Sequence, residues 1–220
     1  MNPGPEKRLR RTAAIAIPLL LFLSLVCWAF ASPVASSPDD NFHLPSIWCG
    51  LGDREGLCEP SGDPDTRLVP TSVLTGPCYA FRPEESAACW NPDDDALTEA
   101  TSMNASGAYP PLFYATMGVF AGEDISTSVI VMRIVNSAIF VGLLTAVFFV
   151  LPTRVRPALL ISTLATSVPL GLFVVASTNP SSWAIASAAM VWVCLYGATQ
   201  SEGRRQIVLG ALAVIGAIIG

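Results

Sequence analysis

Two adjacent carboxylates and a histidine follow the first apolar stretch of the chain, as Asp39, Asp40 and His43. If that stretch crosses a membrane, these residues lie at the membrane surface. A carboxylate there could act as a general base toward a sugar hydroxyl, or could help to bind a divalent cation. The alternative is structural, because an aspartate suits the start of a short helix and the helix dipole favours its charge. From these residues alone we favour the structural interpretation.

Arg133 is the one charged residue embedded in a predicted span, about six residues from the outer end of the apolar segment 127–151. A charge within the bilayer is costly and usually faces a polar cavity or a partner. An arginine at this depth can instead extend its side chain to the headgroups. Asn136 lies three residues further along and therefore shares the helical face of Arg133. The sequence leaves both interpretations open.

An aromatic segment lies shortly before this span. Residues 109–114 read Tyr-Pro-Pro-Leu-Phe-Tyr. The two prolines suit the first turn of a helix, and the aromatic rings suit the headgroup region. The segment predicts a short helix that lies against the membrane over residues 109–120, with a simple aromatic anchor as the alternative.

A second polar segment, Thr178-Asn179-Pro180-Ser181-Ser182-Trp183, separates two later apolar stretches. Asn-Pro marks a tight turn, and a serine after it can cap the next helix. Taken locally, the segment indicates only a turn.

The composition predicts a membrane protein. Of the 220 residues 52% are hydrophobic and only 13% are charged, against about a quarter charged in soluble domains. A helix needs roughly 20 apolar residues to cross a bilayer. The predicted fold is therefore an all-α polytopic membrane protein of about five transmembrane helices, whose last helix is truncated, with a large polar loop that includes a short membrane-surface helix. The predicted spans are residues 13–34, 127–151, 157–177, 181–199 and the start of a fifth at 206–220.

The fifth apolar stretch is short. Its fifteen residues reach only about 22 Å as a helix, less than the bilayer thickness of about 30 Å. We therefore expect the N-terminal part of a longer protein, or a truncated gene product.

Basic residues predict the orientation in the plasma membrane. They occur in residues 1–12, between the second and third spans at Arg154 and Arg156, and before the fifth at Arg204 and Arg205. Because basic residues mark the cytoplasmic side, the N-terminus is predicted to be cytoplasmic and the loop 35–126 extracytoplasmic.

The loop is acidic, since residues 36–125 hold 15 of the 17 acidic side chains. This charge argues against nucleic acid or an anionic lipid surface as its partner. For the N-terminal stretch, a cleaved signal peptide ending near Ala29-Phe30-Ala31 is the alternative to a retained helix. We favour a retained helix, because its run of about 19 apolar residues exceeds the usual 7–15 of a signal peptide.

Four cysteines lie in the loop and allow three pairings. The local pairing, Cys49 with Cys58 and Cys78 with Cys89, closes two short loops and implies an oxidising compartment. A zinc site is the alternative, but neither a C-x-x-C motif nor a Cys/His cluster is present, and His43 lies outside both pairs. No metal is predicted. Turn-forming residues predict irregular backbone over residues 46–98.

Together these features resemble a family of uncharacterised, mostly actinobacterial membrane proteins, domain of unknown function 2142. The resemblance covers most of the chain and rests on Pro38-Asp39-Asp40-x-x-His43, the block 109–114, Arg133, and Asn179-Pro180-Ser181 before a span that contains Trp192. The usual first motif of the family is closer to Pro-Asp-Glu-Pro-x-His. Here Asp40 replaces the glutamate, so the resemblance leaves the role of this second carboxylate open.

The family looks like a branch of the GT-C membrane glycosyltransferases. The resemblance implies transfer of a sugar from a polyprenyl-phosphate donor to a glycan acceptor at the outer face of the membrane, in cell-envelope assembly. It implies Asp39 or Asp40 as the base and Arg133 as the cation near the departing phosphate. Besides the membrane lipid and these substrates, it implies no cofactor. The expected substrate-binding residues are His43, Arg133, Tyr109, Tyr114 and Asn179.

Two other classes of function remain as alternatives. A transporter would place polar groups along several spans at mid-membrane, whereas the spans after Asn136 hold mostly Ser and Thr. An envelope scaffold or receptor would use the disulfide-stapled loop as a binding surface and would need no pair of acids.

Overall fold

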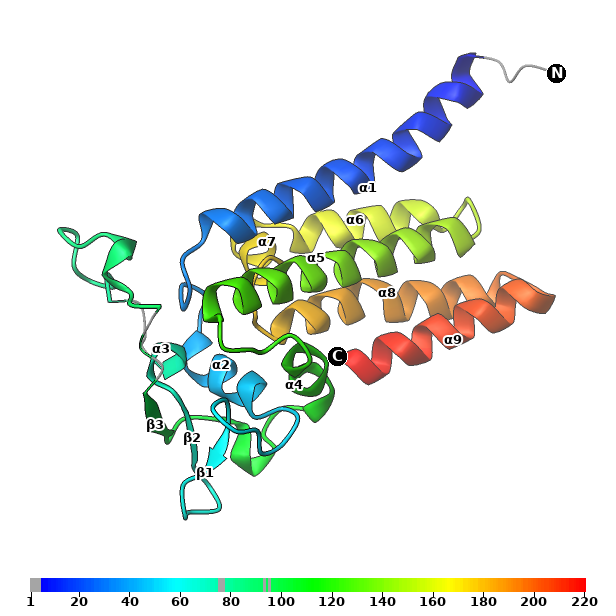
Figure 1. The fold of residues 1–220 in the computed structure, drawn as a ribbon. Helices are drawn as coiled ribbons and strands as arrows, with labels where there is room; N and C mark the ends of the chain where they lie inside the picture. The colour runs from blue at the N-terminus through cyan, green and yellow to red at the C-terminus, as the bar shows by residue number, and fades with distance from the viewer. Residues whose placement is uncertain (1–4, 75–77, 93, 95) are drawn as a thin grey trace.

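The computed structural model describes residues 5–74, 78–92, 94 and 96–220. Long helices lie side by side in a bundle, and a smaller part built from the segment between α1 and α5 covers one end of it (Figure 1). The predicted cytoplasmic segment 1–12 lies partly outside the described residues, and the remainder of it belongs to helix α1.

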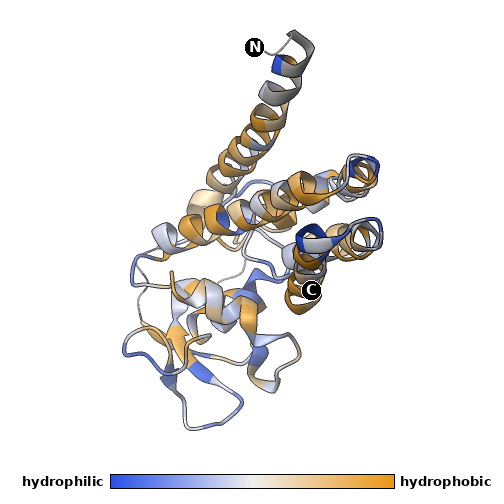
Figure 2. Cartoon of the chain, turned by 90° about the vertical axis from the view of Figure 1, so that its right-hand side faces the viewer, coloured by the Kyte–Doolittle hydropathy of each residue, from blue (hydrophilic) through white to orange (hydrophobic). Residues whose placement is uncertain are grey.

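Among the residues that the structure describes, three helices are long and apolar enough to cross a membrane. They are α1 (Pro5–Ala31), of which Thr12–Ala31 qualifies, α5 (Ile125–Val150) and α8 (Ser181–Thr199). Apolar residues run along these helices, whereas the part between α1 and α5 is mixed (Figure 2). The helices overlap the predicted spans 13–34, 127–151 and 181–199.

Where a single span was predicted over residues 157–177, the structure has two helices. α6 (Arg156–Thr166) and α7 (Pro169–Val175) are bent by 96° at a short break, so together they form a broken span or a re-entrant loop. Pro169 lies in the first turn of α7 and the residue before it is extended, as expected ahead of a proline. Within the described part of the chain, the number of helices able to cross a membrane is therefore three, or four if the bent pair is one span.

The last helix, α9 (Gly203–Ile219), has 17 residues. It therefore rises only about 26 Å, less than the hydrocarbon thickness. α9 packs antiparallel against α8 (Figure 1), and the two share a buried apolar core with α5 through Met190, Leu209 and Val147.

The segment between α1 and α5 differs from the prediction, which was an all-α fold with irregular backbone over residues 46–98. It contains a three-stranded antiparallel sheet in the order β1 (Glu59–Pro60), β2 (Arg67–Pro70), β3 (Leu97–Ala100). In the register, Leu68 of β2 faces Glu59 on one side and Glu99 on the other. The prediction missed the sheet because its strands are very short and β2 pairs with a strand far along the chain.

Short helices complete this part: α2 (Asp40–Trp48), α3 (Thr71–Leu74), the two 3-10 turns η1 (Ala87–Cys89) and η2 (Asn104–Ser106), and α4 (Pro111–Gly118). α4 is the helix predicted within residues 109–120, and Pro111 opens it. It packs against α2 in a second apolar core rather than lying only on a membrane surface. That core joins Leu44 and Trp48 of α2, Phe113 and Met117 of α4, and Trp183 of α8.

The predicted disulfide pairing is confirmed. Cys49 is bonded to Cys58 and Cys78 to Cys89, with Cα–Cα distances of 5.2 Å and 6.1 Å. The first bond ties the C-terminal end of α2 to the start of the sheet region, and the second closes a loop that extends away from the rest of the chain (Figure 1).

Candidate functional site

Asp40 is the first residue of α2 and has 1% of its surface exposed. Its Oδ2 accepts a hydrogen bond from the backbone N–H of Ser37 at 3.0 Å, and its Oδ1 accepts one from the Thr178 hydroxyl at 2.7 Å. Thr178 lies in the turn before α8, so one carboxylate joins the segment between α1 and α2 to a turn far along the chain.

Arg133 faces this carboxylate from α5. Its Nη2 lies 4.0 Å from Oδ2 of Asp40, and 1% of each side chain is exposed. The guanidinium also donates to the carbonyl oxygens of Ala29 at 3.2 Å, Ser32 at 2.6 Å and Pro33 at 2.8 Å. The last carbonyls of a helix have no partner within the helix, so Arg133 caps the C-terminal end of α1. Its charge therefore lies inside the protein, with a partner.

Asn179 supports the same region from the turn before α8. Its side-chain amide donates to the carbonyl of Pro38 at 2.9 Å, and its side-chain oxygen accepts from the N–H of Ser181 at 2.8 Å. The segment that carries Asp39 is thus tied to the start of α8.

Asn136 forms a second tie, one helical turn from Arg133. Its amide donates to the carbonyls of Val175 and Ser177, and its oxygen accepts from Trp183 Nε1 at 3.0 Å. These contacts hold the end of α7 and the start of α8 against α5.

Asp39 has the opposite environment to its neighbour. It is exposed, and its backbone is left-handed, with φ 60° and ψ 19°. Aspartate tolerates this conformation better than most residues. The carbonyl of Asp39 accepts the N–H of His43 at 2.9 Å, while the side chain makes no capping bond to α2. The structure therefore separates the two acids into one buried and one free carboxylate.

His43 lies on α2 and bonds to α4. Its Nδ1 is 3.0 Å from the hydroxyl of Tyr114, and Tyr109 lies edge-on to its ring at 5.4 Å between centroids. Burial lowers the pKa of His43 to about 4, against an opposing effect of the Asp39 charge. The imidazole is therefore neutral at pH 7. Burial also raises the pKa of the Tyr114 hydroxyl, which keeps this pair uncharged.

The pKa of Asp40 is raised to about 6. Burial is the largest cause, because a carboxylate loses its hydration there. The charge of Arg133 and the hydrogen bonds from Thr178 and Ser37 oppose the effect of burial, and the charge of Asp39 adds to it. A partner at 4.0 Å thus compensates only part of the desolvation cost.

The structure brings all seven predicted site residues to one end of the bundle. Asp39, Asp40 and His43 lie at the start of α2, where Asp40 faces Arg133 and His43 contacts Tyr109 and Tyr114. Asn179 bonds to Pro38 beside them. Sequence reasoning missed two residues of the site, Ser37 and Thr178, which both donate hydrogen bonds to Asp40. Thr178 stands beside the Asn-Pro turn, which was the only available signal.

The two adjacent carboxylates differ in their access to solvent. Across the part of the chain that the structure describes, no group of three or more His, Cys, Asp or Glu side chains could hold a metal ion. Asp40 has its oxygens engaged and is shielded from solvent, so Asp39 is the carboxylate that a substrate could reach.

Comparison with known proteins places this site within a family. No curated protein and no solved structure matches the chain. One family model, described as predicted membrane protein (DUF2142), matches residues 22–219. The match extends from the middle of α1 to the end of α9 and includes every residue of the site, so the chain belongs to the DUF2142 family of predicted membrane proteins.

Proposed function

We propose that this chain is part of a GT-C-like glycosyltransferase that transfers a sugar from a polyprenyl-phosphate donor to a glycan acceptor at the outer face of the membrane, in cell-envelope assembly. The observation that supports it best is the contrast between Asp39 and Asp40. One carboxylate is exposed, and its neighbour is buried against Arg133 and Thr178. A general base for this transfer needs a side chain that the substrate can reach and a backbone that is held in place.

In the proposed reaction Asp39 takes the proton of an acceptor hydroxyl. The oxygen attacks the anomeric carbon of the donor sugar, the bond from that carbon to the phosphate oxygen breaks, and polyprenyl phosphate leaves. Asp40 is a positioning residue, since its bonds to Ser37 and Thr178 hold the turn that carries Asp39.

Arg133 was expected to contact the departing phosphate. In this structure its Nη atoms face Asp40 and the carbonyls at the end of α1. We therefore assign it to the positioning of Asp40 and α1. Tyr109, which is 39% exposed, is the proposed direct substrate contact, and the buried His43 lies beside it. Tyr114 holds His43 through its hydroxyl, and Asn179 holds the segment before Asp39 through the carbonyl of Pro38.

The proposal requires a defined orientation in the plasma membrane. The N-terminus and the turns near Arg154 and Arg204 would be cytoplasmic, and the loop with the disulfides extracytoplasmic. Single cysteines at the exposed positions Asp65 and Thr153 test this with a membrane-impermeant maleimide on intact cells. Labelling at Asp65→Cys alone is expected, and labelling at Thr153→Cys alone would overturn the proposed site.

Transfer itself is tested in membranes that contain the protein as its cells produce it. Labelled polyprenyl-phosphate sugars are supplied one at a time, and incorporation into glycan is measured. Asp39→Asn is expected to lower the rate by about 10²-fold or more, the scale of general-base catalysis, without a change in thermal stability. Glu84→Gln, at an exposed position of the same loop, is the matched control. Undiminished transfer by Asp39→Asn would refute the assignment of the base.

A non-enzymatic envelope scaffold is the second candidate, and one observation favours it. Phe81, at the loop closed by Cys78–Cys89, is fully exposed with a left-handed backbone. An exposed aromatic side chain on a stapled loop suits a binding surface. Loss of a cell-envelope phenotype in Phe81→Ser but not in Asp39→Asn would favour the scaffold over the enzyme.

A further inference from the structure

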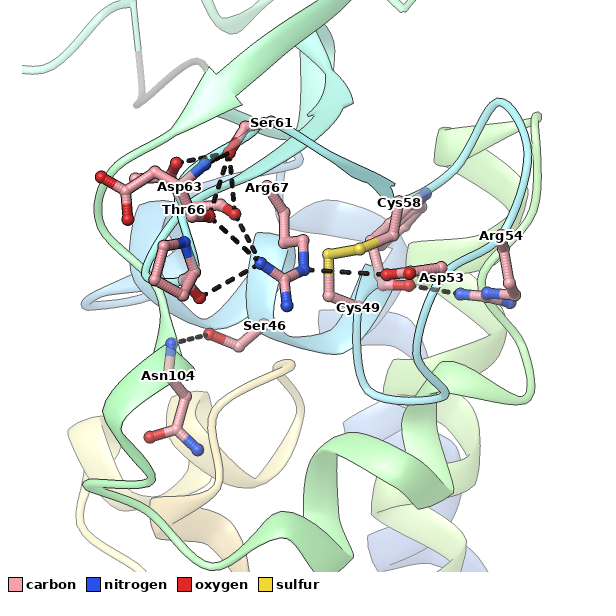
Figure 3. The surroundings of a disulfide bond; sticks show 12 residues. Ser46, Cys49, Asp53, Arg54, Cys58, Ser61, Asp63, Thr66, Arg67 and Asn104 are labelled. Atoms are coloured by element: carbon pink, nitrogen blue, oxygen red, sulfur yellow. Dashed lines mark hydrogen bonds and ion pairs between the residues drawn. A yellow bond between two sulfur atoms is a disulfide. The ribbon is translucent and has the colours of Figure 1, made fainter.

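A cavity of about 240 Å³ lies at the C-terminal end of α2, on the side of the disulfide Cys49–Cys58. Its walls come from several elements: α2, the turn after it, the β2 strand, the segment around η2, and α4. Figure 3 shows Arg67 directed between Asp53 and the loop of residues 61–66, with Ser46 and Asn104 below it. The polar side chains of the lining include Ser46, Asp53, Arg67 and Asn104.

The walls of this cavity are fixed before any ligand arrives. The Ser46 hydroxyl accepts the N–H of Asn104 at 2.8 Å and donates to the Phe42 carbonyl at 2.6 Å, which joins η2 to α2. Gly50 allows α4 to pack closely, because a Cβ there would collide with the Tyr114 carbonyl. The disulfide holds the remaining wall. A preformed pocket loses little entropy on binding.

The charges of the lining cancel. Arg67 Nε lies 3.7 Å from Asp53 Oδ1, and the two side chains are 33% and 62% exposed. Arg67 Nη1 also donates to the carbonyls of Asp63, Pro64 and Thr66, at 3.5 Å, 3.2 Å and 2.7 Å. These bonds orient the guanidinium, and Figure 3 shows its remaining nitrogen, Nη2, on the side of Ser46, another residue of the lining. A neutral lining that presents a donor beside an acceptor disfavours an anion and matches adjacent hydroxyl groups.

We propose that this cavity binds one neutral sugar unit of a glycan, with Arg67 and Asp53 bonded to adjacent hydroxyls. Pro64, Met103 and Pro111 also line the cavity and supply apolar surface for the C–H face of the ring. The volume suits a single sugar ring and excludes a long chain.

The position of the cavity relates it to Asp39. Ser46 lies six residues after Asp40 on α2, about 9 Å along the helix axis. A glycan seated in the cavity would therefore extend along α2 toward the exposed carboxylate. Tyr114 lines the cavity and also bonds to His43, so both places share α2 and α4 as supports. The role of the cavity as a subsite for the acceptor rests on the proposed transferase function, whereas its binding of a sugar does not.

The experiment uses the whole protein in lipid nanodiscs, without any donor. Binding of neutral methyl glycosides, one sugar type at a time, is followed by saturation-transfer NMR, with methyl glucuronide as the charged comparison. We expect saturable binding of at least one neutral glycoside, weakened by about tenfold in Asp53→Asn and in Arg67→Ala, which is the effect of about 1.4 kcal/mol. Arg82→Ala, an exposed arginine of the other disulfide loop, should bind as the native protein does.

Absence of saturable binding by every glycoside, tighter binding of the glucuronide, or equal binding by Asp53→Asn and the native protein would each overturn the proposal. Asp53→Asn changes an exposed side chain by one atom, so it separates loss of binding from loss of fold. Asp39→Asn should bind the glycoside normally. If it does so but still transfers sugar, the assigned base is wrong and the sugar site stands. If Arg67→Ala binds normally while Asp39→Asn abolishes transfer, only the sugar site is refuted.

Discussion

Arg133 of α5 and Asp40 of α2 lie 4.0 Å apart in an interior where each side chain has 1% of its surface exposed. Through this pair and the three carbonyls at and just after the end of α1 that also accept from Arg133, the end of α1 and the start of α2 are joined to α5. Removing one partner of a buried pair leaves an uncompensated charge, which costs more than the pair itself contributes.

Arg133→Met is therefore expected to destabilise the protein by about 3–5 kcal/mol. It leaves Asp40 without its counter-ion and the end of α1 without donors. Thermal unfolding in detergent measures the loss. The double variant Arg133→Met with Asp40→Asn should recover part of it, because the buried charge is gone. Arg154→Met, in an exposed turn, should change stability by no more than about 0.5 kcal/mol. A double variant that loses the sum of both single effects would show that the residues are not coupled.

The pH dependence of stability should reveal two opposed titrations near α2. The pKa of Asp40 is raised to about 6, so the folded state holds more protons than the unfolded state between about pH 4 and 6. The contribution of Asp40 to the free energy of unfolding therefore falls as pH rises through this range. The pKa of His43 is lowered to about 4, so its contribution rises over about pH 4 to 6.5. The native protein should therefore show little net slope there.

Single substitutions should expose each slope. In Asp40→Asn, stability should rise with pH, because only the titration of His43 remains. In His43→Gln, stability should fall with pH, because only the titration of Asp40 remains. The groups that face Asp40 are Arg133, Asp39 and Tyr79. Those that face His43 are Asp39, Tyr109 and Tyr114. Unfolding midpoints at pH 4.5, 5.5 and 6.5 give the slopes. The same slope in both variants would contradict the two assignments.

Gly171 lies at the bend between α6 and α7, where a Cβ would collide with the Thr166 carbonyl oxygen. Gly171→Ala should therefore open the bend or shift α7, at a cost of about 1–3 kcal/mol. Gly210→Ala in α9 is the matched control, since a Cβ there meets nothing within 4 Å. It should leave stability unchanged or raise it by up to about 1 kcal/mol, the difference in helix propensity. Equal effects of the two substitutions in thermal unfolding would mean that the close contact at the bend is unimportant.

The two disulfides should differ in their access to reductant. Cys89 is exposed, whereas Cys58 has none of its surface exposed. Under native conditions a water-soluble phosphine should reduce Cys78–Cys89 first, as mass spectrometry of alkylated peptides would show. Loss of Cys49–Cys58, which closes a loop of about ten residues, should cost roughly 3 kcal/mol in the chain-entropy model. Reduction of both bonds at one rate in the folded protein would contradict the difference in burial.

Sequence alone determined the features that depend on local composition. Runs of apolar residues predicted the three long helices, since crossing a bilayer requires length and hydrophobicity and little else. The disulfide pairing followed from short separations along the chain, and Pro111 marked the start of α4. The break before Pro169 also has a local signal in the sequence, because the residue before a proline disfavours the helical conformation.

Tertiary structure alone decided which distant groups meet. The partners of Arg133 include backbone carbonyls at residues 29–33, and every residue carries a carbonyl, so no pattern of side chains could identify them. The pairing of β2 with β3 likewise depends on a register between segments about thirty residues apart. Asp39 and Asp40 are chemically identical neighbours, and only the packing of α1, α5 and the turn before α8 around α2 buries one of them and leaves the other in contact with solvent.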